Sequence, residues 1–98
     1  MRAAKVDANQ SEIVRAWRDV GATVQLLHTV GHGCPDALVG YQGINYVAEI
    51  KTETGRLNSR ERRWHDEWHG QKAIVRTVRE GLAMLGLEVE GVEEESAH

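Results

Sequence analysis

The spacing of apolar positions changes several times along this chain, and each change predicts a new element. A first stripe recurs at helical spacing and predicts a helix over residues 10–20 that ends at Gly21. This stripe consists of Ile13, Val14, Trp17 and Val20. Residues 23–28 then alternate, with Val24 and Leu26 on one side, which is typical of a half-buried strand.

Residues 31–51 predict a β-hairpin, and the other elements are arranged around it. A loop rich in glycine precedes a short apolar run at residues 37–39, and a turn follows near Gln42. Residues 44–51 alternate again, with Ile44, Tyr46, Ala48 and Ile50 on one face. The other face carries Asn45, Val47, Glu49 and Lys51. A carboxylate and an ammonium therefore share one side of a strand.

The hairpin also brings a third ionisable group to this place. With the turn near Gln42, Asp36 falls opposite Ala48 or Glu49. Facing Cβ atoms in an antiparallel pair lie about 4.5–5.5 Å apart, which suits two carboxylates that share one cation. The spacing alone favours a solvated polar face over catalysis, and the strand context, which places Glu49 and Lys51 together, strengthens the case for catalysis.

The second half of the chain predicts a helix, a strand and a short closing helix. Asn58 is a suitable N-cap for a helix over residues 59–69 that ends at Gly70, with Trp64 and Trp68 on its buried stripe. A β-branched run at residues 73–78 predicts a strand parallel to the hairpin's second strand, because such crossovers are right-handed. A short helix follows at residues 80–85. The order is α-β-β-β-α-β with a final helix, an α/β fold with a mixed sheet flanked by helices.

Composition adds a domain boundary and an uneven charge. The chain has 98 residues, and its formal net charge is −3. We expect a single domain at residues 1–87 and a disordered acidic tail at residues 88–98. The stretch between Lys51 and Arg63 is basic, which suits a polyanionic partner. We find no transmembrane run and no signal-peptide pattern, and we expect a cytoplasmic protein that does not bind membranes.

Two carboxylates and a lysine on one strand face suit phosphodiester hydrolysis. Asp36 and Glu49 would hold Mg²⁺ or Mn²⁺, and the backbone carbonyl of Ile50 would be a further ligand. Lys51 would orient the attacking water and offset negative charge in the transition state. Glu12, on the first helix, would add a further catalytic carboxylate.

Structural roles are alternatives for several of these residues. Glu12 would equally close a capping box with Asn9, and Glu61 would do so with Asn58. The three tryptophans fit apolar stripes better than base-stacking platforms. A zinc set is an alternative use of His32, Cys34, His65 and His69. The single cysteine rules out an internal disulfide and is better explained as a packed residue than as a nucleophile.

The flanking residues carry a specific resemblance to a known family. The segments that carry it are GHGCPD at residues 31–36, EIKT at 49–52, GRL at 55–57 and ERRW at 61–64. Together they resemble the VRR-NUC family of the PD-(D/E)XK nuclease superfamily, in its compact stand-alone virus and phage type. The resemblance spans roughly residues 9–85. In this family, glutamine often occupies the position that corresponds to Glu61.

The resemblance implies a restriction-endonuclease-like αβββαβ core and metal-dependent cleavage of DNA. It places Asp36, Glu49 and Lys51 on the family's catalytic positions and Glu12 on its first-helix acidic position. It also implies a homodimer that acts on branched DNA such as Holliday junctions, in a phage or a bacterial host cell. We expect DNA phosphate contacts from four arginines: Arg56, Arg60, Arg62 and Arg63.

Two other functions remain open at this point. The chain could be a non-catalytic DNA-binding or assembly subunit that keeps the nuclease fold. It could also be a nuclease that needs a partner protein, such as a helicase or another replication or repair factor, to deliver DNA.

Overall fold

The computed structural model describes residues 8–88 and contains the predicted order of elements. The described elements are α1 (Ala8–Asp19), β1 (Thr23–Leu26), β2 (Ala37–Tyr41), β3 (Ile44–Ile50), α2 (Ser59–Glu67), β4 (Lys72–Val75) and α3 (Val78–Met84). The predicted α/β fold with a mixed sheet is therefore confirmed. The predicted acidic tail, except Glu88, and residues 1–7 lie outside the described residues.

The strands form one sheet in the order β1-β2-β3-β4. The first three strands are antiparallel, and β4 runs parallel to β3 after the α2 crossover, as predicted. Gln42 and Gly43 form the hairpin turn, with φ values of 51° and 84°. Positive φ at both central residues is the geometry that matches strand twist in two-residue hairpins. The resulting register pairs Ala37 with Ala48. Because the strands are antiparallel, Asp36, which precedes Ala37, lies opposite Glu49, which follows Ala48.

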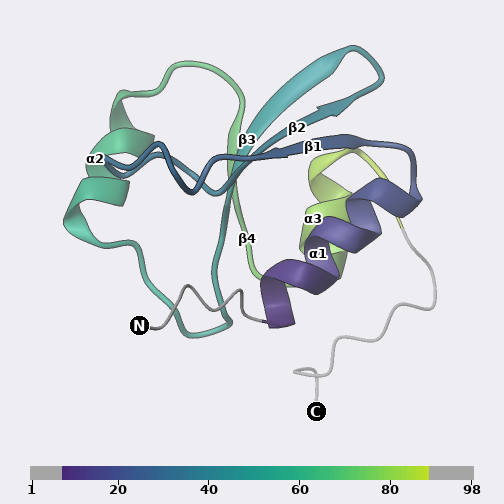
Figure 1. Cartoon of the computed structure of the whole chain (residues 1–98), viewed down its shortest axis with the longest axis horizontal. Coiled ribbons are helices and arrows are strands. Elements are labelled where there is room, and N and C mark those ends of the chain that lie inside the picture. Colours follow the sequence, from purple (N-terminus) through teal and green to yellow (C-terminus); the bar gives the residue numbers. More distant parts are fainter. Residues whose placement is uncertain (1–7, 89–98) are drawn as a thin grey trace.

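The helices cover the two faces of the sheet unequally. In Figure 1, α1 and α3 lie together on one side of the strands, and α2 lies on the other side. The core fills the α1–α3 side, where Trp17 and Ile13 are fully buried. The indole Nε1 of Trp17 donates a hydrogen bond to the backbone carbonyl of Gly81 at 2.9 Å.

Gly81 is unfavourable for helix propensity, and the packing of α3 explains its presence. A Cβ atom at this position would lie 3.1 Å from Cγ2 of Ile13 and 3.2 Å from Nε1 of Trp17. Because these two side chains are fully buried, they have little room to move aside. The glycine therefore allows α3 to pack closely on α1, at a cost of roughly 1 kcal/mol in helix propensity.

Three details of the predicted helices are wrong. Asn9 lies inside α1 and does not cap it, because the helix already begins at Ala8. The second helix ends at Glu67, where Trp68 adopts an extended conformation, so Gly70 does not terminate it. Trp68 is 42% exposed, and the buried residue of α2 is His65. None of the helices between residues 8 and 88 is long and apolar enough to cross a membrane.

Candidate active site

Asp36 is held at the start of β2 by backbone hydrogen bonds on both sides. Its carbonyl accepts from the backbone N–H of Leu27 at 2.8 Å, which ties it to the end of β1. Its carboxylate Oδ2 accepts from the backbone N–H of Ile50 at 2.7 Å. The side chain is thus directed toward the end of β3, where the prediction placed it beside Glu49.

Glu49 is the buried carboxylate of this site. It is 3% exposed, and its Oε1 atom has no hydrogen-bond partner among residues 8–88. The strand alternation predicted its direction but not its burial. Burial first, and then the negative charges of Asp36 and Glu61, raise the pKa of Glu49 to about 8, and Lys51 offsets this only in part. A buried acceptor without a partner is costly unless a cation or a proton satisfies it.

Lys51 lies between two carboxylates, one from each side of the site. Its Nζ is 3.6 Å from Oε2 of Glu49 and 3.0 Å from Oε1 of Glu61. Partial burial by itself would lower the pKa of Lys51, but the hydrogen bond and charge of Glu61, and then the charges of Glu49 and Asp36, raise it. The lysine therefore stays charged and is oriented toward Glu49.

Glu61 has two roles in the structure. Its Oε1 accepts from the backbone N–H of Asn58 at 2.9 Å, and the Asn58 side chain accepts from the backbone N–H of Glu61 at 2.8 Å. The predicted capping box is confirmed. Desolvation would raise the pKa of Glu61, but the Asn58 backbone and Lys51 lower it. The pairing with Lys51, which the sequence did not predict, joins the start of α2 to the end of β3.

Two further side chains hold the connector that follows Lys51. Asn9 donates from Nδ2 to the carbonyl of Lys51 at 2.8 Å. Arg76 donates from Nη1 to the carbonyls of Thr52 and Gly55 at 2.7 and 2.6 Å. Both act on carbonyl groups distant in sequence, and neither spacing nor composition signals such contacts.

The residues present fit a hard divalent cation. Asp36 and Glu49 bring two carboxylates together, and no group in the described part of the chain hydrogen-bonds to Oε1 of Glu49. In an antiparallel pair, a residue directs its N–H and its C=O toward the same neighbour. Because the N–H of Ile50 meets Asp36, its carbonyl also faces that side. Oxygen donors of this kind are those that Mg²⁺ and Mn²⁺ prefer.

The zinc alternative finds no support in the geometry. Between residues 8 and 88, no three His, Cys, Asp or Glu side chains form a group suited to a metal ion. His65 is buried, whereas His32 and His69 are exposed. Burial, with the charges of Glu49 and Asp36, raises the pKa of the Cys34 thiol. A thiol of raised pKa is a poor nucleophile and a poor zinc ligand. This agrees with the interpretation of Cys34 as a packed residue.

The other predicted site residues lie at the surface. Glu12 is exposed on α1, one turn after Asn9, and its catalytic role stays a prediction. Its capping role is wrong, because Asn9 is inside the helix. The four arginines are partly or fully accessible, and their DNA contacts also stay predictions. Arg60, Arg62 and Arg63 lie on α2, while Arg56 precedes it in the connector.

Comparison with known proteins gives one informative match. No protein-family model and no curated protein matches the sequence. A solved structure described as "VRR_NUC domain" superposes with a TM-score of 0.66 at 17% sequence identity. The match covers 82% of this chain and 97% of that chain. This chain has the fold of a VRR_NUC domain. The fold agrees with the family resemblance of the sequence.

In this VRR_NUC fold, the raised pKa of Glu49 predicts how stability depends on pH. A carboxylic acid with a raised folded-state pKa holds its proton more tightly when folded, so stability falls as pH rises from its ordinary value of 4.5 to about 8. In chelator, we expect Glu49→Gln to gain stability over wild type across this window, by up to about 1.4 kcal/mol per pH unit. Urea unfolding at pH 5, 6.5 and 8 measures the difference.

Groups that do not interact with Glu49 cancel in that comparison. Burial, then the charge of Lys72, lowers the pKa of His65, so His65 contributes stability that increases as pH rises toward about 6.5 and then levels off in both proteins. Glu53→Gln removes an exposed carboxylate and is the matched control. Parallel stability curves for Glu49→Gln and wild type would contradict the burial argument.

Proposed function

We propose that the protein is a metal-dependent DNA endonuclease that acts on branched DNA. The buried carboxylate of Glu49, whose Oε1 atom has no hydrogen-bond partner among residues 8–88, lies beside Asp36 and Lys51 and is the observation that carries this proposal. Buried polar atoms in folded proteins usually have a partner, so an acceptor left without one beside Asp36 and Lys51 suits a bound cation. The VRR_NUC fold and the family resemblance of the sequence support the same activity.

Each residue has a distinct task in this proposal. Asp36 and Glu49 hold Mg²⁺ or Mn²⁺, with the Ile50 carbonyl as a further ligand. When bound, such an ion lowers the pKa of a coordinated water and stabilises charge on the phosphate. Lys51 places its ammonium beside the scissile phosphate, and its ion pair with Glu61 sets its direction. Glu12 contributes a further carboxylate from α1.

The charge around this site fits a nucleic-acid substrate. Arg56 and Arg62 are exposed and contact phosphates along the DNA, which gives affinity without base recognition. Two copies of the chain present two such sites to the strands of a four-way junction, as in the compact phage-type members that the sequence resembles. The protein acts in the cytoplasm of a bacterial host cell.

A single gel experiment tests this function. Purified protein is incubated with linear, flap, forked and four-way DNA, each with Mg²⁺ and with a chelator. We expect cleavage of the branched substrates with Mg²⁺ and none with the chelator. Failure to cut any substrate with either Mg²⁺ or Mn²⁺ would contradict the proposed nuclease activity. Cleavage that continues in the chelator would contradict the proposed dependence on a metal ion. Cleavage by the protein alone would also exclude an obligatory helicase partner.

A further inference from the structure

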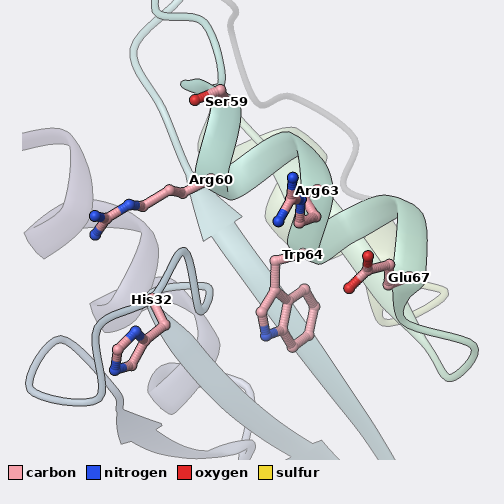
Figure 2. Close-up of a pocket in the computed structure, with 6 residues that line it drawn as sticks. All are labelled: His32, Ser59, Arg60, Arg63, Trp64 and Glu67. Carbon is pink, nitrogen blue, oxygen red and sulfur yellow. The ribbon is translucent and has the colours of Figure 1, made fainter.

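A pocket of about 440 Å³ lies between the loop that carries His32 and α2. Its volume is within the range of small-molecule sites, which is about 300–1,000 Å³. The pocket is lined by His32, Ser59, Arg60, Arg63, Trp64 and Glu67. In Figure 2, the side chains of Arg60 and Trp64 extend from α2 toward the side of the pocket where His32 lies. None of these six residues belongs to the carboxylate site.

The two walls of the pocket are held together by backbone contact. A Cβ atom on Gly33 would lie 2.4 Å from the carbonyl oxygen of Arg60, so only glycine permits this approach. Gly33 also has a φ of 83°, in the region that favours glycine. The preceding residue, His32, adopts a φ of 60°, which is uncommon for a residue with a side chain. The loop is therefore fitted to α2, and the pocket is part of the fold.

The lining combines the groups that bind a nucleotide outside a duplex. Arg60 and Arg63 supply guanidinium groups for a phosphate, and Ser59 adds a hydroxyl. Trp64 supplies an aromatic surface on which a base can stack. Trp68 stacks on the Trp64 indole at a centroid distance of 4.7 Å but does not line the pocket. Trp64 therefore meets the pocket with its remaining surface, and Trp68 supports it from outside.

The same two segments carry the pocket and the candidate active site. His32 stands four residues before Asp36, and Arg60 is the neighbour of Glu61, which pairs with Lys51. The pocket therefore lies on the same loop and helix as residues of the candidate active site, along which a bound DNA strand would run. A base in a continuous duplex is already stacked on both sides and is not available to Trp64.

We propose that this pocket binds one unpaired nucleotide of the DNA substrate. Its base stacks on Trp64, and its phosphate is held by Arg60 and Arg63. The proposal rests on the DNA-directed function above and specifies what the protein recognises at a flap or a fork, which is the unpaired nucleotide at the branch. Binding without cleavage keeps the two proposals separable.

The test measures binding in a chelator with fluorescence anisotropy. The probes are a labelled single strand, the corresponding blunt duplex, and a duplex with a short unpaired gap. We expect wild type to bind the gapped and single-stranded probes at least about ten-fold more tightly than the duplex, as aromatic stacking of one base provides. Equal affinity of wild type for all three probes would overturn the proposal that the pocket binds an unpaired nucleotide.

Variants with matched controls assign the effect to the pocket. Trp64→Ala is expected to lose the preference, whereas Trp64→Phe keeps an aromatic ring and retains most of it. Arg63→Gln is compared with Arg62→Gln, which removes the same charge from α2 outside the pocket. Only Arg63→Gln should reduce the preference, while both weaken duplex binding alike. Equal loss of preference in the two arginine variants would assign it to net charge and overturn the proposal.

The outcomes also distinguish this inference from the nuclease. If the protein prefers unpaired DNA but never cleaves it, the proposed nucleotide pocket is supported and the proposed nuclease activity is rejected. Cleavage of branched DNA by Trp64→Ala at the wild-type rate, together with unchanged binding preference, would uphold the nuclease and reject the pocket. Circular dichroism of each variant confirms that it is folded before either conclusion is drawn.

Discussion

Glu49→Gln is expected to reduce the rate of DNA cleavage by at least about 1,000-fold, which corresponds to about 4 kcal/mol of transition-state stabilisation. The substitution keeps the volume and the buried position of the side chain, which is 3% exposed in the protein. It removes the anionic oxygen that has no partner among the described residues. A neutral amide is a weak ligand for Mg²⁺, so the loss is chemical and not structural. Gel assays on four-way DNA at saturating Mg²⁺ measure it.

Two controls make this result interpretable. Glu53→Gln removes the same charge from an exposed position in the connector and should leave the rate within about two-fold of wild type. Calorimetry with Mn²⁺ should show binding to wild type and at least about ten-fold weaker binding to Glu49→Gln. A cleaving Glu49→Gln preparation would overturn the proposed site. If wild type bound no Mn²⁺, the non-catalytic DNA-binding subunit would become the better explanation.

The elements of the fold were predictable because local patterns and packing agree. The alternation of β3 and the short turn at Gln42 determine one register, and a slip by one residue would expose Ala48 and Ile50. The same register brings Asp36 beside Glu49, so the central pair of the site follows from the pattern as well. The end of α2 was harder to predict, because Lys72 on the neighbouring strand donates to the carbonyls of His65 and Trp68 there.

The remaining features of the site depend on contacts between distant segments. Glu49 is buried although the alternation marks its strand face as polar, and Glu61 of α2 lies close enough to help raise its pKa. Asn9 looked like a helix cap, but its amide instead meets the carbonyl of Lys51, 42 residues away. His65, a polar residue, is buried in α2, while Trp68 is exposed. Whether such a side chain is buried or exposed depends on which distant segments pack together, and a single sequence carries no local signal for that.

Lys51→Met is expected to reduce the cleavage rate by at least about 100-fold while it leaves Mn²⁺ binding intact. The ammonium contacts both Glu49 and Glu61, and no ligand oxygen is lost when it is removed. Lysine contributes a compact positive charge to the transition state, in the range that one such electrostatic contact supplies. Cleavage rates and Mn²⁺ calorimetry together therefore separate the residues that bind the metal from the residue that stabilises charge in the transition state.

The conservative variant completes this test. Lys51→Arg keeps the charge but replaces the compact ammonium by a planar group, so we expect it to recover only part of the lost rate. Removing the positive charge also leaves Glu49 and Glu61 facing each other without a cation between them. Lys51→Met should for this reason show a lower unfolding temperature in chelator, and Mn²⁺ should raise it again. Wild-type cleavage by Lys51→Met would mean that charge at this position does not act on the phosphate, and the lysine would then only balance the two carboxylates.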